Sequence, residues 1–293
     1  MNAPSALVPD LARMERDVRR LAVVRHAVAA PDALRAAEDF IAVELGATGL
    51  RVERQLFQWS GREFHNVVAT NDGGDAARPW VVVGAHFDST AHTPGADDNA
   101  SACAAMLEIA RLLAGWRPAA TIQFVGINLE EVQHWLPPVY RIGSRAYAKK
   151  LKAESRKLKA ALVLEMVGFT GERQRVPAAV KLFKKIPSRG TFLAAVGDHN
   201  SVHLLEAMER AATGLIELVT LQVPLKGFLV PDTRRSDNAR FWDEDYPSLM
   251  ITDTADLRNP HYHRASDTPD TLDYAFMGKV VETVMRVVVE LAS

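Results

Sequence analysis

The chain has 293 residues, 48% of them apolar, so it is long enough to bury a large core and its composition excludes a disordered chain. Its 35 Lys and Arg residues nearly balance 36 Asp and Glu residues, which leaves no basic field for nucleic acid. A single cysteine, Cys103, excludes an internal disulfide and a multi-cysteine metal site. The sequence has neither the apolar stretch of a signal peptide nor the roughly 20 apolar residues of a membrane span, so we expect a cytoplasmic protein with no membrane partner.

Hydrophobic periodicity predicts helices that alternate with strands along the chain. The predicted helices occupy residues 9–28, 31–45, 101–114, 143–151, 200–213 and 271–291. The predicted strands occupy residues 50–58, 63–70, 80–86, 121–129, 160–169, 191–198, 216–223 and 247–253. This alternation favours an α/β sheet with helices on both faces, and because no linker or repeat interrupts it, a single domain is the simplest interpretation.

Five polar clusters lie at the ends of apolar runs, and each contains histidine or carboxylate side chains. They occupy residues 84–90, 94–101, 128–131, 162–169 and 259–268. Imidazole and carboxylate are ligands of hydrolytic zinc, and a shared carboxylate can hold two ions close together. Functional residues of an open α/β sheet gather in the loops after the strand carboxyl ends. The joint appearance of the clusters therefore predicts a dinuclear metal site at that edge of the sheet.

The first two clusters combine a histidine with aspartates. Asp88 lies two residues after His86, so in extended chain both side chains point to the same side and Asp88 can accept the second ring N–H. A histidine satisfied by a local carboxylate without metal is the alternative. Asp97 and Asp98 precede a predicted helix, and N-capping of that helix is the simple interpretation. We expect Asp98 to bridge the two ions.

The remaining clusters contain glutamates and histidines. Glu165 interrupts an apolar run, where an uncompensated carboxylate is costly, so it needs a metal or an Arg partner. Glu130 and Glu131 are adjacent at a strand end, so one can bind metal while its neighbour reaches a water molecule. A solvated charged loop is the alternative. His261 and His263 offer imidazole ligands in a segment that is otherwise a polar loop.

A few residues near these clusters are candidates for substrate binding. Trp135 lies in an aromatic, proline-rich loop that we expect to wall a substrate pocket, with a surface loop as the alternative. Arg234, Arg235 and Arg264 flank two motifs that should border the site. A guanidinium can hold a carboxylate through two hydrogen bonds, so one of the three is a candidate clamp for an acidic substrate group. The alternative is that they are solvated or paired with nearby aspartates.

The motifs AHFDS, PGADDNAS, the EE pair, GSRAYA and YHRASDTPDTLDY resemble those of the dinuclear zinc exopeptidases, metallopeptidase family twenty-eight. That family includes bacterial leucyl aminopeptidase and, more distantly, glutamate carboxypeptidase and glutaminyl cyclase. The resemblance implies a three-layer α/β/α sandwich around a mixed, mostly parallel sheet, the fold of zinc exopeptidases and phosphorylase/hydrolase-like proteins. It implies one catalytic domain over residues 1–293, with an N-terminal helix in residues 1–30 packed on it.

The resemblance also implies a role for each site residue. The implied ligands of two Zn²⁺ ions per chain are His86, Asp98, Glu131, Glu165 and His263. Asp88 would orient the first histidine, and Glu130 would be the general base. The implied reaction is hydrolysis of a peptide or small amide substrate by metal-activated water, most simply by an aminopeptidase.

Three features depart from the family pattern. Its best-known members have aspartate where this chain has Glu165, the usual SDH triplet is SDN at residues 236–238, and the segment between Glu131 and Gly143 is longer. The stretch EEVQHW resembles the glutaminyl cyclase branch, so cyclase-like aminoacyl transfer is an alternative, although such cyclases use one zinc. An amidohydrolase of a small metabolite and a non-catalytic binding domain are further alternatives. The sequence leaves the substrate and the oligomeric state open.

Overall fold

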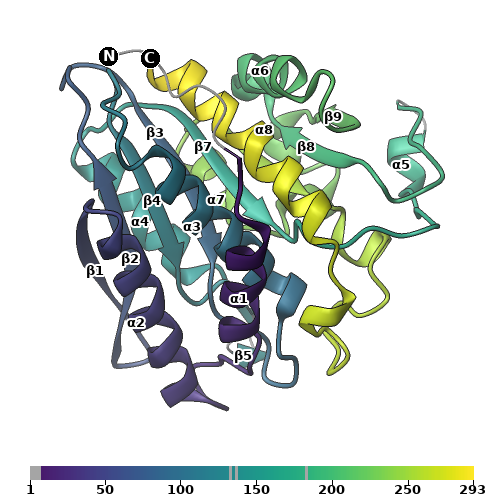
Figure 1. The fold of residues 1–293 in the computed structure, drawn as a ribbon, viewed down its shortest axis with the longest axis horizontal. Helices are drawn as coiled ribbons and strands as arrows, with labels where there is room; N and C mark the ends of the chain where they lie inside the picture. Colours follow the sequence, from purple (N-terminus) through teal and green to yellow (C-terminus); the bar gives the residue numbers. More distant parts are fainter. Residues whose placement is uncertain (1–7, 132–133, 136–137, 182–183) are drawn as a thin grey trace.

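The structure is a computed structural model that describes residues 8–131, 134–135, 138–181 and 184–293. Its centre is a sheet of eight strands with helices on both faces (Figure 1). The strands are β1 (Arg51–Trp59), β2 (Arg62–Asn71), β3 (Trp80–His86), β4 (Ile122–Ile127), β7 (Leu158–Glu165), β8 (Leu193–Gly197), β9 (Leu218–Gln222) and β10 (Ser248–Thr252). Two short strands, β5 (His134–Trp135) and β6 (Pro138–Val139), pair with each other outside this sheet.

The order of the strands in the sheet is β1-β2-β4-β3-β7-β10-β8-β9. Strands β4, β3, β7 and β10 run parallel in the middle, and β9 runs parallel to β8. Antiparallel pairing joins β1 to β2, β2 to β4 and β10 to β8. The predicted mixed, mostly parallel sheet is therefore confirmed. Because β4, β3 and β7 are parallel neighbours, their carboxyl ends meet at one edge of the sheet.

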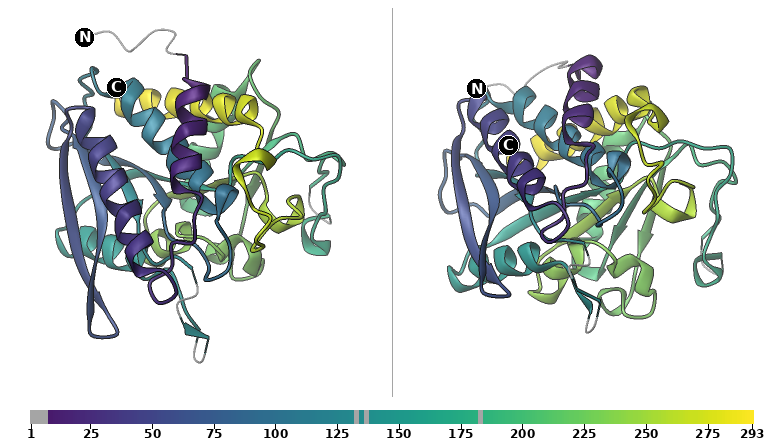
Figure 2. Two further views of the ribbon diagram at one scale, coloured as in Figure 1. Left: turned by 60° about the horizontal axis from the view of Figure 1, so that its bottom comes forward. Right: turned by 90° about the horizontal axis from the view of Figure 1, so that it is seen from below.

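Helices form a layer on each side of the sheet, and the view from below shows the sheet between them (Figure 2). One layer contains α2 (Pro31–Ala47), α3 (Ala102–Leu113), α6 (Val202–Ala212) and α8 (Tyr274–Ala292). The other contains α4 (Ile142–Ala153) and α7 (Asn238–Asp243), and a one-turn helix, α5 (Ala178–Lys181), lies in a peripheral segment. The N-terminal helix α1 (Leu11–Leu21) packs on α3 and α8.

The central strands are buried on both faces, which accounts for their continuous apolar sequence. In β3, the side chains of Val81 and Val83 belong to the core under α3 and α8, whereas Val82 belongs to the core on the α4 side. Side chains alternate between the two faces of a strand, so a strand covered on both sides needs apolar residues at every position. This rigid centre positions the residues that follow the strand ends.

Two predicted elements end earlier than the apolar pattern indicates. The helix predicted at residues 9–28 ends at Leu21, because the backbone N–H and carbonyl of Arg25 hydrogen-bond to Ser89 instead of to a helical turn. The strand predicted at residues 160–169 ends at Glu165, where Met166 adopts a left-handed conformation (φ 49°). The six-residue helix α7 was not predicted. Within the described part of the chain, no helix is long and apolar enough to cross a membrane.

Candidate metal centre

Three neighbouring strands end side by side and carry several of the candidate residues. His86 is the last residue of β3, and Glu165 is the last residue of β7, its parallel neighbour. Glu130 and Glu131 follow β4, which is the parallel neighbour of β3 on the other side. The topology therefore gathers one imidazole and three carboxylates at one edge of the sheet, although they lie up to 79 positions apart in the chain (86 to 165).

Two further candidates come from loops. Asp98 is buried in the turn that precedes α3, and its neighbour Asp97 is buried as well. The N-terminus of α3 has no side-chain cap among the described residues, so capping does not account for these aspartates. His263 lies in the loop between β10 and α8, and its side chain is 35% exposed.

The five candidate ligands form two clusters that share Asp98. In the first, the inner ligand set (His86, Asp98 and Glu165), the Nε2 atom of His86 lies 3.4 Å from Asp98 Oδ1 and 3.6 Å from Glu165 Oε2. In the second, the outer ligand set (Asp98, Glu131 and His263), the Nε2 atom of His263 lies 3.0 Å from Asp98 Oδ2 and 3.2 Å from Glu131 Oε1. Each oxygen of Asp98 therefore faces a different set.

The spacing of these atoms fits zinc. Two ligand atoms that each lie about 2.0–2.1 Å from a tetrahedral zinc ion are roughly 3.3 Å apart, close to all four distances. In addition, His86 Nε2 and Asp98 Oδ1 are buried and have no hydrogen-bond partner in the described structure. Buried polar atoms are rarely left without a partner, so an ion between them would complete the inner set. The outer set offers the same nitrogen and oxygen donors.

Asp88 connects the two strand ends that carry the site. Its Oδ1 atom lies 3.5 Å from Nδ1 of His86, the ring nitrogen other than the one that faces Asp98. Its two oxygens accept hydrogen bonds from the backbone N–H groups of Glu130 (3.0 Å) and Glu131 (3.1 Å). A single buried carboxylate therefore holds both the imidazole and the glutamate pair in position.

Two other aspartates hold the turn that carries Asp98. Asp267 accepts hydrogen bonds from the backbone N–H groups of Asp97 (2.9 Å) and Asp98 (3.2 Å). Asp97 in turn accepts from the backbone of Gly168 (2.9 Å) and from the side chain of Asn259 (2.7 Å). The sequence analysis missed these supporting roles. The only signal available was that both aspartates lie inside the polar clusters.

Arg25 supports the same loops from the N-terminal segment. Its fully buried guanidinium donates to the carbonyl oxygens of Phe87 (2.7 Å), Pro94 (2.7 Å) and Gly95 (3.1 Å). Phe87 directly follows the last residue of β3, and Gly95 lies in the turn before Asp98. These partners are 62 to 70 positions away from Arg25 in the chain, so no local pattern could have revealed the role.

Glu130 lies among other carboxylates and is 7% exposed. Burial raises the pKa of Glu130 well above its usual range; the imidazole of His86 opposes this shift, and Asp237, Glu131 and Glu165 reinforce it. A carboxyl group whose pKa lies above its usual range is suited to accept and return a proton. The environment of Glu130 thus favours acid–base chemistry.

Left-handed backbone conformations gather around the site. Leu129 (φ 56°), Arg141 (φ 55°), Met166 (φ 49°) and His263 (φ 56°) all lie in this region. Such a conformation costs a non-glycine residue about 1 kcal/mol or more, and it persists only where the surroundings hold it. Three of these residues, Leu129, Met166 and His263, lie next to or at candidate site residues, where the chain turns sharply. Strained backbone of this kind is often found at functional sites.

A cleft of about 470 Å³ opens onto both ligand sets and onto Glu130. Its remaining walls include Tyr140, Arg141, Phe228, Arg234, Arg235 and Tyr262. The side chain of Trp135, which we expected to wall a substrate pocket, lies outside the described residues.

The three arginines singled out in the sequence occupy different surroundings. Arg234 donates to Asp243 (2.5 Å), and Arg235 donates to Asp256 (2.8 Å), although both border the cleft. Arg264 is exposed and is not part of the cleft wall. Arg234 and Arg235, the two of these three that border the cleft, thus have carboxylate partners of their own.

An apolar cavity of about 140 Å³ adjoins the cleft, and the two share Glu165, Arg235 and Tyr262 as wall residues. Its floor is formed by side chains from three neighbouring strands, Val196 on β8, Leu221 on β9 and Met250 on β10. The cavity therefore places apolar surface directly beside the inner ligand set.

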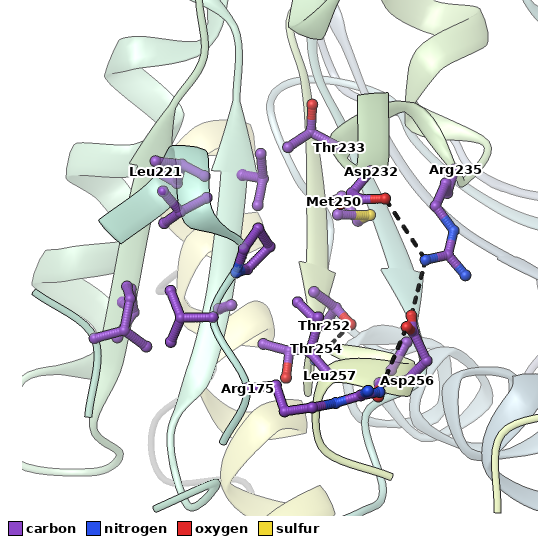
Figure 3. A pocket seen from close by; sticks show the side chains of 18 of the residues that line it. Arg175, Leu221, Asp232, Thr233, Arg235, Met250, Thr252, Thr254, Asp256 and Leu257 are labelled. Carbon is purple, nitrogen blue, oxygen red and sulfur yellow. Dashed lines mark hydrogen bonds and ion pairs between the residues drawn. The ribbon is translucent and has the colours of Figure 1, made fainter. Parts of the chain in front are cut away.

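A chain of ion pairs runs along one side of this cavity (Figure 3). Arg235 lies 3.8 Å from Asp232 and 2.8 Å from Asp256, and Arg175 lies 3.8 Å from Asp256. The charged groups satisfy one another at the rim, which leaves the interior of the cavity apolar.

Two sets of imidazole and carboxylate groups at the carboxyl edge of an α/β/α sandwich are the arrangement that the resemblance to zinc exopeptidases implies. A profile of Peptidase family M28 matches residues 66–288. The chain therefore belongs to peptidase family M28, and the predicted family is confirmed. Membership of this family supports a hydrolase that acts on peptide substrates.

Individual relatives agree with this assignment. The uncharacterized protein YfbL of Escherichia coli (strain K12) is 34% identical over 291 residues, which cover 93% of this chain and 86% of that protein. Leucine aminopeptidase 1 of Trichophyton rubrum is 28% identical over 242 residues, which cover 78% of this chain but 58% of the relative. The solved structure of glutaminyl cyclase from Porphyromonas gingivalis has a TM-score of 0.74 at 18% identity and covers 97% of this chain and 99% of that chain, which shows a shared fold.

Proposed function

We propose that the protein is a zinc-dependent aminopeptidase that holds two zinc ions. The observation that carries the proposal is the position of Asp98, a buried carboxylate whose two oxygens face His86 at 3.4 Å and His263 at 3.0 Å. The inner set would hold one ion, the outer set the other, and Asp98 would bridge them. When bound, zinc supplies a Lewis acid that activates water and polarises a carbonyl group.

We assign proton transfer to Glu130. It borders the cleft beside the outer ligand Glu131, and among the described carboxyl groups of the cleft wall it is the one that neither ligand set uses. Its carboxylate takes a proton from the attacking water and returns it to the amine that leaves. Asp88 keeps this base in place through its hydrogen bond to the backbone N–H of Glu130.

The apolar cavity beside the inner ligand set suggests the side-chain preference. A substrate whose carbonyl group lies at the ligand sets would place its N-terminal side chain near Glu165 and Tyr262, where the cavity begins. The cavity is large enough for an aliphatic side chain, and burial of such a side chain contributes about 1.5–3 kcal/mol. We therefore expect leucyl and methionyl substrates to be cleaved faster than glycyl or acidic ones.

The first test is a panel of leucyl, glycyl and glutamyl amides with zinc-loaded protein, combined with the variant Glu130→Gln. This variant keeps the shape of the side chain and removes the base, so turnover should fall roughly 10²–10⁴-fold while about two equivalents of zinc are retained. Glu217→Gln, at an exposed position, is the matched control and should behave like wild type. Near-normal turnover of Glu130→Gln would refute the assignment.

A glutaminyl cyclase-like aminoacyl transfer is the second candidate, and the fold shared with a glutaminyl cyclase favours it. In that reaction the free amine of an N-terminal glutamine attacks its own side-chain amide, and ammonia leaves. Peptides with N-terminal glutamine should release ammonia without peptide cleavage if this reaction dominates. A zinc stoichiometry near one instead of two would favour the same candidate.

A further inference from the structure

Arg141 is a buried cation in the active-site cleft, and among the residues that the structure describes it forms no salt bridge. It is 7% exposed, it forms part of the cleft wall, and its Nε and Nη1 atoms have no hydrogen-bond partner in the described structure. The guanidinium stacks on the ring of Tyr140 at 4.3 Å. Glu130 and Asp237 are near enough to act on its charge, but neither forms a salt bridge with it within the described residues. A buried guanidinium normally has its N–H groups satisfied, so this one points to a ligand.

The backbone holds Arg141 against the segment that carries the general base. Its N–H donates to the carbonyl oxygen of Glu130 (2.7 Å), and the next residue, Ile142, donates to Leu129 (2.8 Å). Its left-handed conformation (φ 55°) begins the turn into α4. These hydrogen bonds fix the position of Arg141 relative to Glu130. Arg141 therefore lies next to the residue that, in the proposed reaction, protonates the leaving amine.

We propose that Arg141 binds the carboxylate of an amino-acid leaving group, so that the preferred substrates are dipeptides with a free C-terminus. The inference rests on the proposed aminopeptidase activity. In a dipeptide, the carboxylate carbon is only two bonds and about 2.5 Å from the nitrogen that leaves. A group that recognises it must therefore lie next to the base that protonates that nitrogen, as Arg141 does. The planar guanidinium can bind both carboxylate oxygens.

The other arginines of the cleft wall are less available for this role. Arg234 donates to Asp243 and Arg235 to Asp256, so a substrate carboxylate would have to displace an existing partner. For Arg141 there is no such competitor among the described residues. Within the described part of the chain, the Nε and Nη1 atoms of Arg141 thus identify which cation of the cleft is left to recognise a substrate.

The decisive experiment compares leucyl-alanine with leucyl-alaninamide on zinc-loaded wild type, Arg141→Gln and Arg141→Lys. Charged hydrogen bonds of this kind change affinity by roughly tenfold or more, so wild type should favour the free acid by about that factor in kcat/KM, mainly through KM. Arg141→Gln should lose the preference, because its kcat/KM falls more on the free acid than on the amide. Arg141→Lys should retain part of it. Arg145→Gln, an exposed arginine one turn along α4, is the matched control.

Substrate binding to a variant that hardly turns over separates this inference from the proposed function. Calorimetry with Glu130→Gln should show tighter binding of the acid than of the amide, and the double variant with Arg141→Gln should bind both alike. Acid-selective binding without hydrolysis by wild type would contradict the aminopeptidase and leave the role of Arg141 intact. Equal treatment of acid and amide by wild type, or an equal loss on both in Arg141→Gln, would overturn the inference and indicate a purely structural arginine.

Discussion

The inner and outer ligand sets share Asp98 but are built from different parts of the fold. The inner set takes His86 and Glu165 from the last residues of adjacent parallel strands, and these side chains are 1% and 13% exposed. The outer set takes Glu131 and His263 from loops, and the side chain of His263 is 35% exposed. Ligands on strand ends are positioned more narrowly than ligands on loops. We therefore expect the inner set to hold its ion more tightly and the outer set to exchange its ion.

The side chains that contact the ligands also differ between the two sets, and they too favour tighter metal binding by the inner set. The hydroxyl of Ser236 donates to Glu165 (2.5 Å), and a carboxylate oxygen of Asp88 lies 3.5 Å from Nδ1 of His86, so each inner ligand has a buried polar neighbour. In the outer set, the ring of Tyr262 stacks on His263 at 3.8 Å, and the histidine backbone is left-handed. Hydrogen-bonded support of a ligand raises metal affinity, which favours the inner set.

The largest expected effect follows from replacing the shared ligand. Asp98→Ala removes one donor from each set and should reduce the zinc content from about two equivalents to near zero. Loss of the metal ions removes several kcal/mol of transition-state stabilisation, so activity should fall by roughly 10³-fold or more. Elemental analysis and kcat/KM test this, with Asp72→Ala, at an exposed position, as the control. A variant that keeps two ions would show that Asp98 is not shared.

A smaller effect, on one metal ion only, is expected when a ligand that belongs to one set alone is replaced. His263→Ala should lose the outer ion and keep about one equivalent of zinc, whereas chelator titration of wild type should remove the two ions in separate phases. In His263→Ala, the affinity of the outer set for zinc should fall by more than the roughly 10–100-fold that is typical when only a supporting hydrogen bond to a ligand is lost. His199→Ala, with a side chain 60% exposed, is the matched control. Release of both ions in one phase would contradict the prediction that the two sets differ in their affinity for zinc.

The sequence predicted best those features that depend on neighbouring residues in the chain, namely the buried strands and the polar residues at their ends. Strands with no polar residues had to be buried, and a carboxylate at the end of such a strand, as at Glu165, needed compensation. Because neighbouring parallel strands end at one edge, the positions of His86 and Glu130 followed from the same reasoning. The sheet order, which makes β4, β3 and β7 neighbours, could not be read from the chain but is what brings these residues together.

What the sequence could not predict depends on contacts between distant segments. Arg25 lies before the residues that match the family profile, yet its guanidinium binds the carbonyl groups next to two ligand loops. Asp267 acts through the backbone of a turn about 170 positions away. Arg141 and Arg234 are both arginines in the sequence. Only their surroundings show that Arg234 has a carboxylate partner and that Arg141 has none among the described residues.

The smallest expected effect concerns the protons that metal ions displace, and it again distinguishes the sets. Burial lowers the pKa of His263 in the metal-free protein, but its contacts with Asp98 and Glu131 outweigh burial and raise it to about 10. The protonated imidazole therefore stabilises the metal-free fold fully below about pH 6.5, and this contribution is lost as the pH rises through about 10. Likewise, nearby carboxylates hold the pKa of His86 well above its usual range despite burial.

Because zinc binds neutral imidazole, loading the metal-free protein at pH 7 should release roughly two protons from the histidines, and apparent affinity should rise with pH. A further fraction of a proton should come from Glu131, because burial raises its pKa to about 7. Calorimetry in two buffers with different ionisation enthalpies measures this number directly. His263→Ala should release about one proton fewer, since one histidine fewer then gives up a proton, whereas His261→Ala, outside both sets, should match wild type. If His263→Ala released as many protons as wild type, His263 would not be the outer ligand, and the outer ion would have to be held by carboxylates alone.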